Sequence, residues 1–175
     1  MGNIGKIFEQ QIKKSAPNYA LLYRLPDSAQ SFGRSSSLRF SNKNPFDYIM
    51  WDSVGRILFA LELKTVKGKS ISSERTKDDN GEIHKHQIDG LTEWAKYDGI
   101  IGGFIIEFRQ IEKTIFLRID DFNKLIELIS KKSFTINDLE NNNIPYIVIG
   151  QEKARTRYTY DIDNFIQDIR KGERS

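Results

Sequence analysis

The chain has no cysteine, which excludes disulfides, thiolate metal sites and a cysteine nucleophile. It has only two histidines, His84 and His86, and residues at this spacing do not share a helix face, so a zinc site is not expected. No apolar run approaches the ~20 residues that span a bilayer, and the N-terminal MGNIGKIFEQQIKK lacks the apolar stretch of a signal peptide. We therefore expect a cytoplasmic protein without membrane contact.

The proportions of hydrophobic and charged residues are those of a soluble globular domain. Hydrophobic residues make up 38% and charged residues 29% of the 175 residues, enough for one hydrophobic core. No repeat or linker divides the sequence, so a single domain over residues 1–175 is expected. The net charge of +3 and pI near 9.0 permit a polyanionic partner, although a solvated lysine-rich surface explains the charge equally well.

Hydrophobic periodicity predicts helices over residues 4–14, 84–97, 121–131, 135–141 and 161–170. It predicts strands over residues 46–51, 56–64, 100–108, 114–119 and 145–149. A turn at Asp52, Ser53 and Gly55 joins the first two strands as an antiparallel hairpin, and Asp120 or Asp121 is the expected N-cap of the third helix. Residues 26–44 are expected to form a long loop or arm, and residues 67–82 a polar, mobile segment. The order predicts a mixed α/β fold.

Strand alternation places an acid and a lysine on one surface of the predicted strand 56–64. Glu62 and Lys64 point the same way, whereas Leu61 and Leu63 point into the opposite layer. In a hairpin the start of one strand lies beside the end of its partner, which brings Asp47 of NPFDY towards Glu62 and Lys64. Two carboxylates and an ammonium suit Mg²⁺ and phosphodiester hydrolysis. An ordinary cross-strand charge pair on a wet sheet face is the structural alternative.

The ordered motifs GKIFE, NPFDY, LELK and HKHQ resemble the PD-(D/E)XK nuclease superfamily and, within it, RecU-type Holliday-junction resolvases, including those of phages of Gram-positive bacteria. The similarity covers about residues 4–130. It implies a restriction-endonuclease-like core, with a mixed central sheet flanked by helices. It also implies a homodimer that cleaves four-way DNA junctions by paired nicks with Mg²⁺ or Mn²⁺, in recombination, repair or phage DNA processing.

The resemblance assigns roles to five residues. Asp47 and Glu62 would be metal ligands, and Lys64 would activate water or stabilise charge. Glu9 of the first helix would approach the metal, directly or through water, and Gln87 would place the water or the scissile phosphate. A solvent-facing helix residue is the alternative for Glu9, and a polar residue at a helix N-terminus is the alternative for Gln87.

Candidate DNA-binding groups are basic side chains gathered in loops. They are Arg34, Arg39, Lys43, Lys67, Lys69, His84 and Lys85. The arm over residues 26–44 is shorter than the stalk of the cellular resolvases, so only a reduced stalk is expected, with Phe32 and Phe40 available to stack on unpaired bases. A second set extends this surface or belongs to a charged strand edge: Arg155, Arg157, Tyr158 and Tyr160.

Three further residues are expected to be structural. Trp51 and Trp94 are predicted to lie in the core, and Glu107, in an apolar strand, is predicted to be a satisfied charge. Two alternative functions stay open. One is a PD-(D/E)XK nuclease of restriction or repair type, and the other is a catalytically silent DNA-binding accessory protein on the same fold.

Overall fold

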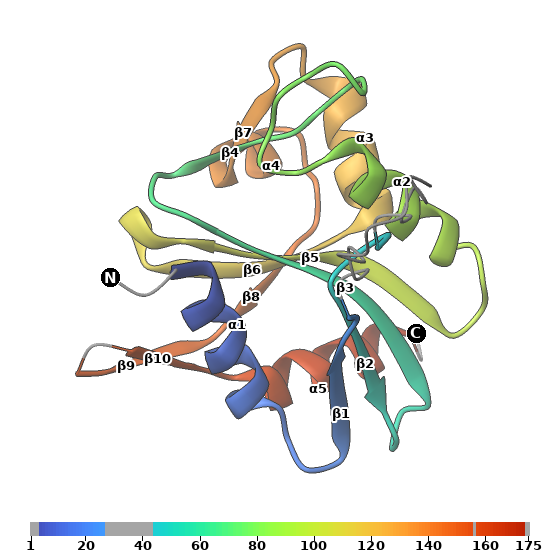
Figure 1. Ribbon diagram of the computed structural model, residues 1–175, viewed down its shortest axis with the longest axis vertical. Helices are drawn as coiled ribbons and strands as arrows, with labels where there is room; N and C mark the ends of the chain where they lie inside the picture. Colours follow the sequence, from blue (N-terminus) through green and yellow to red (C-terminus); the bar gives the residue numbers. More distant parts are fainter. Residues whose placement is uncertain (1–3, 27–43, 156, 174–175) are drawn as a thin grey trace, which may run out of the picture.

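The computed structural model describes residues 4–26, 44–155 and 157–173. The fold is built on a central six-stranded sheet of strand order β1-β2-β3-β5-β6-β8 (Figure 1). Its strands are β1 (Ala20–Arg24), β2 (Tyr48–Asp52), β3 (Ile57–Val66), β5 (Ile100–Phe108), β6 (Lys113–Arg118) and β8 (Ile147–Ile149). The pair β3 and β5 is parallel, and the other neighbours pair antiparallel. The predicted mixed central sheet flanked by helices is confirmed, and it is compatible with a restriction-endonuclease-like fold.

Helices cover both faces of the sheet. They are α1 (Ile4–Ser15), α2 (Lys85–Trp94), α3 (Ile119–Leu128), α4 (Ile136–Asn141) and α5 (Ile162–Glu173). On one face, called here the upper core, α2, α3 and α4 pack against side chains that include Phe104 and Ile106. On the other face, the lower core, α1 and α5 pack against side chains that include Phe59 and Leu61 (Figure 1). The two cores follow the alternation of strand side chains.

Strand β5 is buried on both faces, as its continuous apolar run predicts. Two glycines in its first half allow close packing. A Cβ on Gly102 would lie 2.9 Å from the carbonyl oxygen of Leu91 in α2, and one on Gly103 would lie 2.6 Å from that of Leu117 in β6. The IIGGF sequence thus lets α2 approach the sheet closely, which fixes the height of this helix above β3 and β5.

The segment over residues 67–82 was expected to be polar and mobile, but part of it is ordered and buried. It contains β4 (Ser70–Ser72), which pairs with β7 (Ser133–Thr135), and its Ile71 is fully buried. The guanidinium of Arg75 donates hydrogen bonds to the carbonyl oxygens of Ile126 and Lys131 at 2.6 and 2.9 Å. Polar composition misled the prediction because the polar side chain of Arg75 bonds to backbone groups in and just after α3.

Two other expectations were wrong. Helix α3 begins at Ile119 with Arg118 as its N-cap, so Asp120 and Asp121 occupy the first turn, where acidic groups suit the helix dipole. Trp51 is 40% exposed, although it lies in β2 between Leu21 of β1 and Leu58 of β3. Trp94, by contrast, packs edge-to-face on buried Phe46 at a centroid distance of 4.9 Å, as a core residue should.

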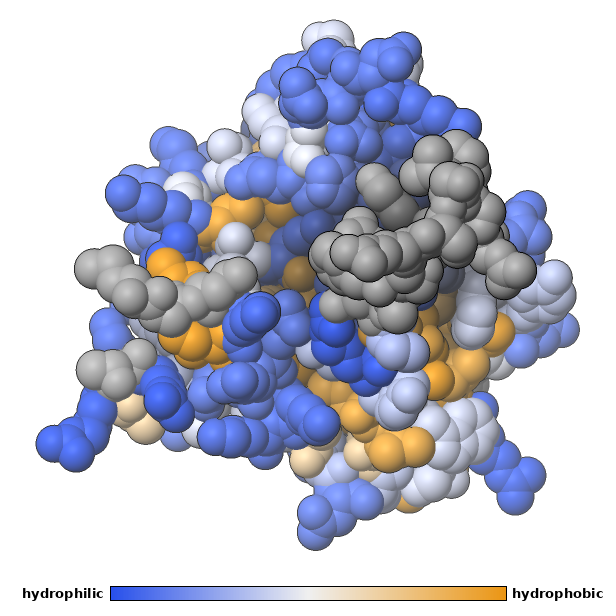
Figure 2. Space-filling view, in the orientation of Figure 1, coloured by the Kyte–Doolittle hydropathy of each residue, from blue (hydrophilic) through white to orange (hydrophobic). Residues whose placement is uncertain are grey.

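The hairpin of β9 (Gln151–Ala154) and β10 (Arg157–Tyr160) was not predicted, and neither was β1. The hairpin extends away from the sheet beside α1 (Figure 1). Apolar side chains reach the surface over β1, where Leu21 is 64% and Tyr23 51% exposed (Figure 2). None of the described helices is long and apolar enough to cross a membrane.

Candidate active site

The hairpin of β2 and β3 brings the predicted carboxylates together. Its last paired residues are Tyr48 and Leu61, and one further step in the antiparallel register sets Asp47 opposite Glu62. The backbone N–H of Leu25 donates a 2.8 Å hydrogen bond to the carbonyl oxygen of Asp47, which holds this strand start in place. Both carboxylates therefore belong to the face of the sheet that α2 covers.

One oxygen of Glu62 receives two donors. The amide Nε2 of Gln87 donates to Oε1 at 2.5 Å, and the ammonium of Lys64 lies 3.0 Å from the same oxygen. The side chain of Glu62 is 1% exposed and that of Lys64 17%. The second oxygen, Oε2, is buried and has no hydrogen-bond partner. Structural carboxylates in a protein interior are normally satisfied at both oxygens, so this atom needs an explanation.

The burial of Glu62 outweighs the charge of Lys64. Burial raises the pKa of Glu62 most, and Lys64 lowers it. Asp47 raises it again, by its charge and by a hydrogen bond that only protonated Glu62 can donate, with a result of about 7. This carboxyl group therefore takes up a proton far more readily than an ordinary glutamate. A cation beside Oε2 would favour the ionised form, which makes Glu62 a candidate ligand that exchanges a proton for a metal ion.

Gln87 is held in one orientation by the start of α2. Its Oε1 accepts a 2.9 Å hydrogen bond from the backbone N–H of His84, so its amide nitrogen must face Glu62. The carboxylate of Glu74 accepts the N–H of Lys85 at 2.7 Å and contacts Nδ1 of His84 at 2.8 Å. Hydrogen bonding to His84 and to the Lys85 N–H lowers the pKa of Glu74. Glu74 thus anchors the turn that aims Gln87.

Sequence reasoning missed Glu74. Its partner His84 is ten residues away, within a segment whose composition suggested mobility. The one local signal was the spacing of His84 and Gln87, which form a capping box. The predicted DNA-binding residues His84 and Lys85 are also engaged in the structure, because the ammonium of Lys85 pairs with Asp89.

The structure does not bring Glu9 to Glu62. Glu9 lies on α1, which packs on the lower core, and its Oε2 accepts a 2.8 Å hydrogen bond from the hydroxyl of Tyr48. Arg24 Nε lies 3.5 Å from the same oxygen. Burial and then the bond to Glu9 raise the pKa of the Tyr48 hydroxyl. Since Tyr48 follows Asp47, Glu9 contacts the neighbour of the site rather than the site itself.

The remaining candidate residues divide into three groups. Lys67 and Lys69 are exposed: Lys67 directly follows β3, and Lys69 directly precedes β4. The arm residues lie outside the described part of the chain: Arg34, Arg39, Lys43, Phe32 and Phe40. In the hairpin of β9 and β10, Arg155 and Arg157 are exposed, whereas Tyr158 bonds to Glu112.

Tyr160 is buried and donates a 2.7 Å hydrogen bond to Glu107. The hydroxyl of Thr65 donates to the other oxygen of Glu107 at 2.5 Å. Glu107 is therefore the satisfied structural charge that was expected, in contrast to Glu62. Tyr160 consequently belongs to the interior and offers no surface to DNA.

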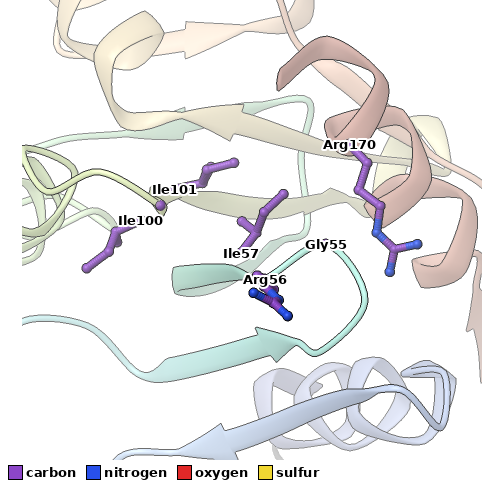
Figure 3. A pocket seen from close by; sticks show the side chains of 7 residues that line it. Gly55, Arg56, Ile57, Ile100, Ile101 and Arg170 are labelled. Carbon is purple, nitrogen blue, oxygen red and sulfur yellow. The ribbon is translucent and has the colours of Figure 1, made fainter. Parts of the chain in front are cut away.

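A pocket lies at the opposite end of β3 from the site (Figure 3). It is lined by Gly55, Arg56, Ile57, Gly99, Ile100, Ile101 and Arg170. Arg170 holds the fully buried Asp52 with hydrogen bonds of 2.7 and 2.5 Å. Its guanidinium is thus committed to a structural ion pair, and the pocket brings together no acid and base for catalysis.

The donor set at Glu62 fits a hard divalent cation. Among the described residues no group of three or more His, Cys, Asp or Glu side chains converges on one point. Mg²⁺ keeps several of its waters, however, so one or two carboxylates are sufficient protein ligands. The buried, unpartnered Oε2 of Glu62 is an oxygen that such an ion would satisfy.

Comparison with known proteins agrees with this geometry. Residues 40–164 match the family model described as Recombination protein U, RecU, a family of Holliday-junction resolvases. The matched range contains Asp47, Glu62, Lys64 and Gln87; it begins after GKIFE and continues past residue 130. The SPbeta prophage-derived uncharacterized protein YotM of Bacillus subtilis (strain 168) is 34% identical over 185 residues, which cover 99% of this chain and 90% of that protein. The chain therefore belongs to the RecU family.

Proposed function

We propose that the protein is a metal-dependent endodeoxyribonuclease that cleaves branched DNA, with the four-way junction as its substrate in recombination. The observation that carries the proposal is the half-satisfied Glu62. Lys64 and Gln87 share its Oε1, Asp47 lies opposite, and Oε2 is buried without a partner. A purely structural charge would be satisfied at both oxygens, as Glu107 is in the same sheet.

In this proposal Asp47 and Glu62 hold Mg²⁺ or Mn²⁺. The bound ion would supply a water of lowered pKa and neutralise charge on the phosphate. Lys64, 17% exposed beside Glu62, orients the attacking water or accepts its proton, and stabilises the negative charge that develops on the phosphate oxygens. Gln87 keeps the carboxylate of Glu62 in one rotamer. Glu9 acts indirectly, because it holds Tyr48 next to Asp47.

We also propose a homodimer. A junction has strands related by two-fold symmetry, so two symmetry-related sites would make paired nicks. The exposed apolar side chains of Leu21, Tyr23 and Trp51, on edge strand β1 and its neighbour β2, support association of two copies. We propose that the protein acts in the cytoplasm, together with its DNA substrate.

The proposal is tested by incubating purified protein with a four-way junction, a linear duplex and single-stranded DNA, each with Mg²⁺, with Mn²⁺ or with EDTA. We expect symmetric cutting of the junction that requires the divalent ion and disappears in Asp47→Ala. The matched control is Asp98→Ala, which removes an exposed aspartate from the turn before β5. This control should cut like the wild type.

Other outcomes identify the alternatives. Equal cutting of the linear duplex would support a nuclease of restriction or repair type. Binding of DNA without cutting under any of these ionic conditions would contradict the enzyme proposal and leave a DNA-binding accessory protein.

A further inference from the structure

A basic cleft lies where β3 and β5 end. Because the two strands are parallel, their carboxyl ends lie side by side, with Val66 paired to Phe108. The next residues along each strand, Lys67 with Gly68 and Arg109 with Gln110, line the cleft. Arg109 and Gln110 belong to the short 3-10 helix η1 (Arg109–Ile111), at the turn that leads from β5 into β6 (Figure 1). Sequence reasoning had singled out Lys67 but not Arg109.

The side chain of Arg109 has a hydrogen-bond donor that no acceptor satisfies. Its Nε is buried and has no hydrogen-bond partner, and its guanidinium forms no ion pair with any residue in the described ranges. A buried donor without a partner costs free energy, and native proteins rarely leave one unexplained. The two acids nearest in sequence are already engaged: Glu107 by Tyr160 and Thr65, and Glu112 by Lys153 and Tyr158.

The residues that line the cleft include no carboxylate. They contribute the ammonium of Lys67, the guanidinium of Arg109 and the amide of Gln110. The cleft therefore presents two positive charges and no anionic oxygen to pair with them. A phosphate group meets this need, because its oxygens accept from a guanidinium and its charge is balanced by the neighbouring ammonium.

The distance between the cleft and the active site indicates which phosphate of the DNA the cleft would bind. Lys67 follows Lys64 by three residues, and a strand advances about 3.3 Å per residue, so the cleft lies roughly 10 Å further along β3. This is about the axial length of three nucleotides of one B-DNA strand. A strand that reacts beside Glu62 and Lys64 would therefore pass the cleft a few nucleotides away.

We infer that the basic cleft binds a backbone phosphate of the DNA strand that flanks the scissile position, with Arg109 as its main ligand and Lys67 as the second charge. This inference rests on the proposed function, since it concerns the same substrate. The contact reads no base, so it serves to position DNA of any sequence.

The test is the salt dependence of DNA binding, measured by fluorescence anisotropy in EDTA so that no cutting occurs. The labelled probes are a four-way junction and a linear duplex. The variants are Arg109→Gln, Lys67→Gln and Arg109→Lys. Lys67→Gln alters an exposed side chain, so the test does not depend on the folding of the Arg109 variants. Arg56→Gln is the matched control, because it removes one charge in the turn at the opposite end of β3 (Figure 3).

Arg109→Gln and Lys67→Gln should each weaken binding several-fold and reduce the slope of log K against log salt by about 1. Arg109→Lys, which keeps the charge, should keep most of the slope, and Arg56→Gln should match the wild type. Unchanged affinity and slope in both Arg109→Gln and Lys67→Gln would overturn the inference. If the wild type still cuts junctions in that case, the proposed nuclease function holds without the phosphate contact at the cleft. If the wild type neither binds nor cuts DNA, the proposed function and the phosphate contact are both wrong.

Discussion

The amide of Gln87 donates a 2.5 Å hydrogen bond to Glu62 and so connects the first turns of α2 to the middle of β3. The other end of the amide accepts the N–H of His84, which removes the freedom of Gln87 to rotate. Glu74 fixes His84 in turn. The orientation of one candidate ligand thus depends on a turn that begins more than ten residues away from it in sequence.

Gln87→Ala should reduce the rate of junction cutting about 10–100-fold, as is typical when a group that orients a metal ligand is lost. The fold should persist, because the substitution keeps the helix. The measurement is single-turnover cutting over a range of Mg²⁺ concentrations, where we expect the half-saturating concentration to rise. Gln10→Ala, on an exposed position of α1, is the control. Unaltered Mg²⁺ dependence in Gln87→Ala would remove this role from the amide.

The raised pKa of Glu62, about 7 against an ordinary 4.5, predicts a pH dependence of stability in metal-free protein. The folded state binds the proton more tightly than the unfolded state. The stabilisation from this proton is therefore complete below about pH 4.5 and is lost as pH rises to about 7, at most about 3 kcal/mol. Urea unfolding in EDTA at several pH values should show this loss in the wild type and not in Glu62→Gln.

The same shift predicts how Mg²⁺ stabilises the protein. Because the ion competes with the proton on Glu62, its effect on the unfolding midpoint should be larger at pH 8 than at pH 6. Glu62→Gln should lose most of the effect at both values. Equal stabilisation of wild type and Glu62→Gln would show that the ion binds elsewhere.

Tyr160→Phe should destabilise the fold without affecting the chemistry. It removes one of the two hydroxyl donors to buried Glu107 and leaves Thr65 as the other. A buried acceptor that loses its partner costs about 1–3 kcal/mol. Denaturant unfolding measures the loss, and Tyr97→Phe, at a residue 62% exposed, is the control. If folded Tyr160→Phe protein cut junctions far more slowly than wild type, the purely structural assignment of Glu107 would be wrong.

Arg170→Met should cost about 3–5 kcal/mol of unfolding free energy, because it leaves Asp52 buried without its ion-pair partner. Burial alone would raise the pKa of Asp52, but the hydrogen bonds of Arg170 and of the Gly55 and Val54 N–H groups lower it. The stability from Asp52 is thus present above its ordinary pKa and is lost as pH falls through the lowered value. The difference in unfolding free energy between wild type and Arg170→Met should therefore be largest near neutral pH and shrink as pH falls. Lys13→Met, in the last turn of α1, should unfold like the wild type.

The meeting of Asp47, Glu62 and Lys64 could be predicted because it depends on local rules alone. Strand alternation sets Glu62 and Lys64 on one face, and a short turn sets the hairpin register. The position of Glu9 depends on packing. Helical periodicity identifies the polar side of α1 but not the face of the sheet against which α1 lies. The match to RecU, which begins at residue 40, likewise leaves this helix out.

Strands β1 and β9 could not be predicted from the sequence for a different reason. Strand β1 has a single buried residue, Leu22, and pairs only with β2. In β9 the residues after Gln151 are exposed, so no apolar alternation marks the strand. Such edge elements are defined by backbone pairing with distant residues, and side-chain pattern carries little information about them.

The order of elements along the chain determines when each part of the lower core is covered during synthesis. Phe165 of α5 packs on Phe59 and Phe116 at centroid distances of 5.6 and 4.9 Å and closes the lower core. The ribosome makes Phe59 long before α5, so at about 5–20 residues per second the part of the lower core that α5 covers stays exposed for roughly 5–20 s. A nascent chain of this protein thus exposes aromatic side chains until α5 emerges, and transiently exposed apolar surface of this kind is prone to aggregation.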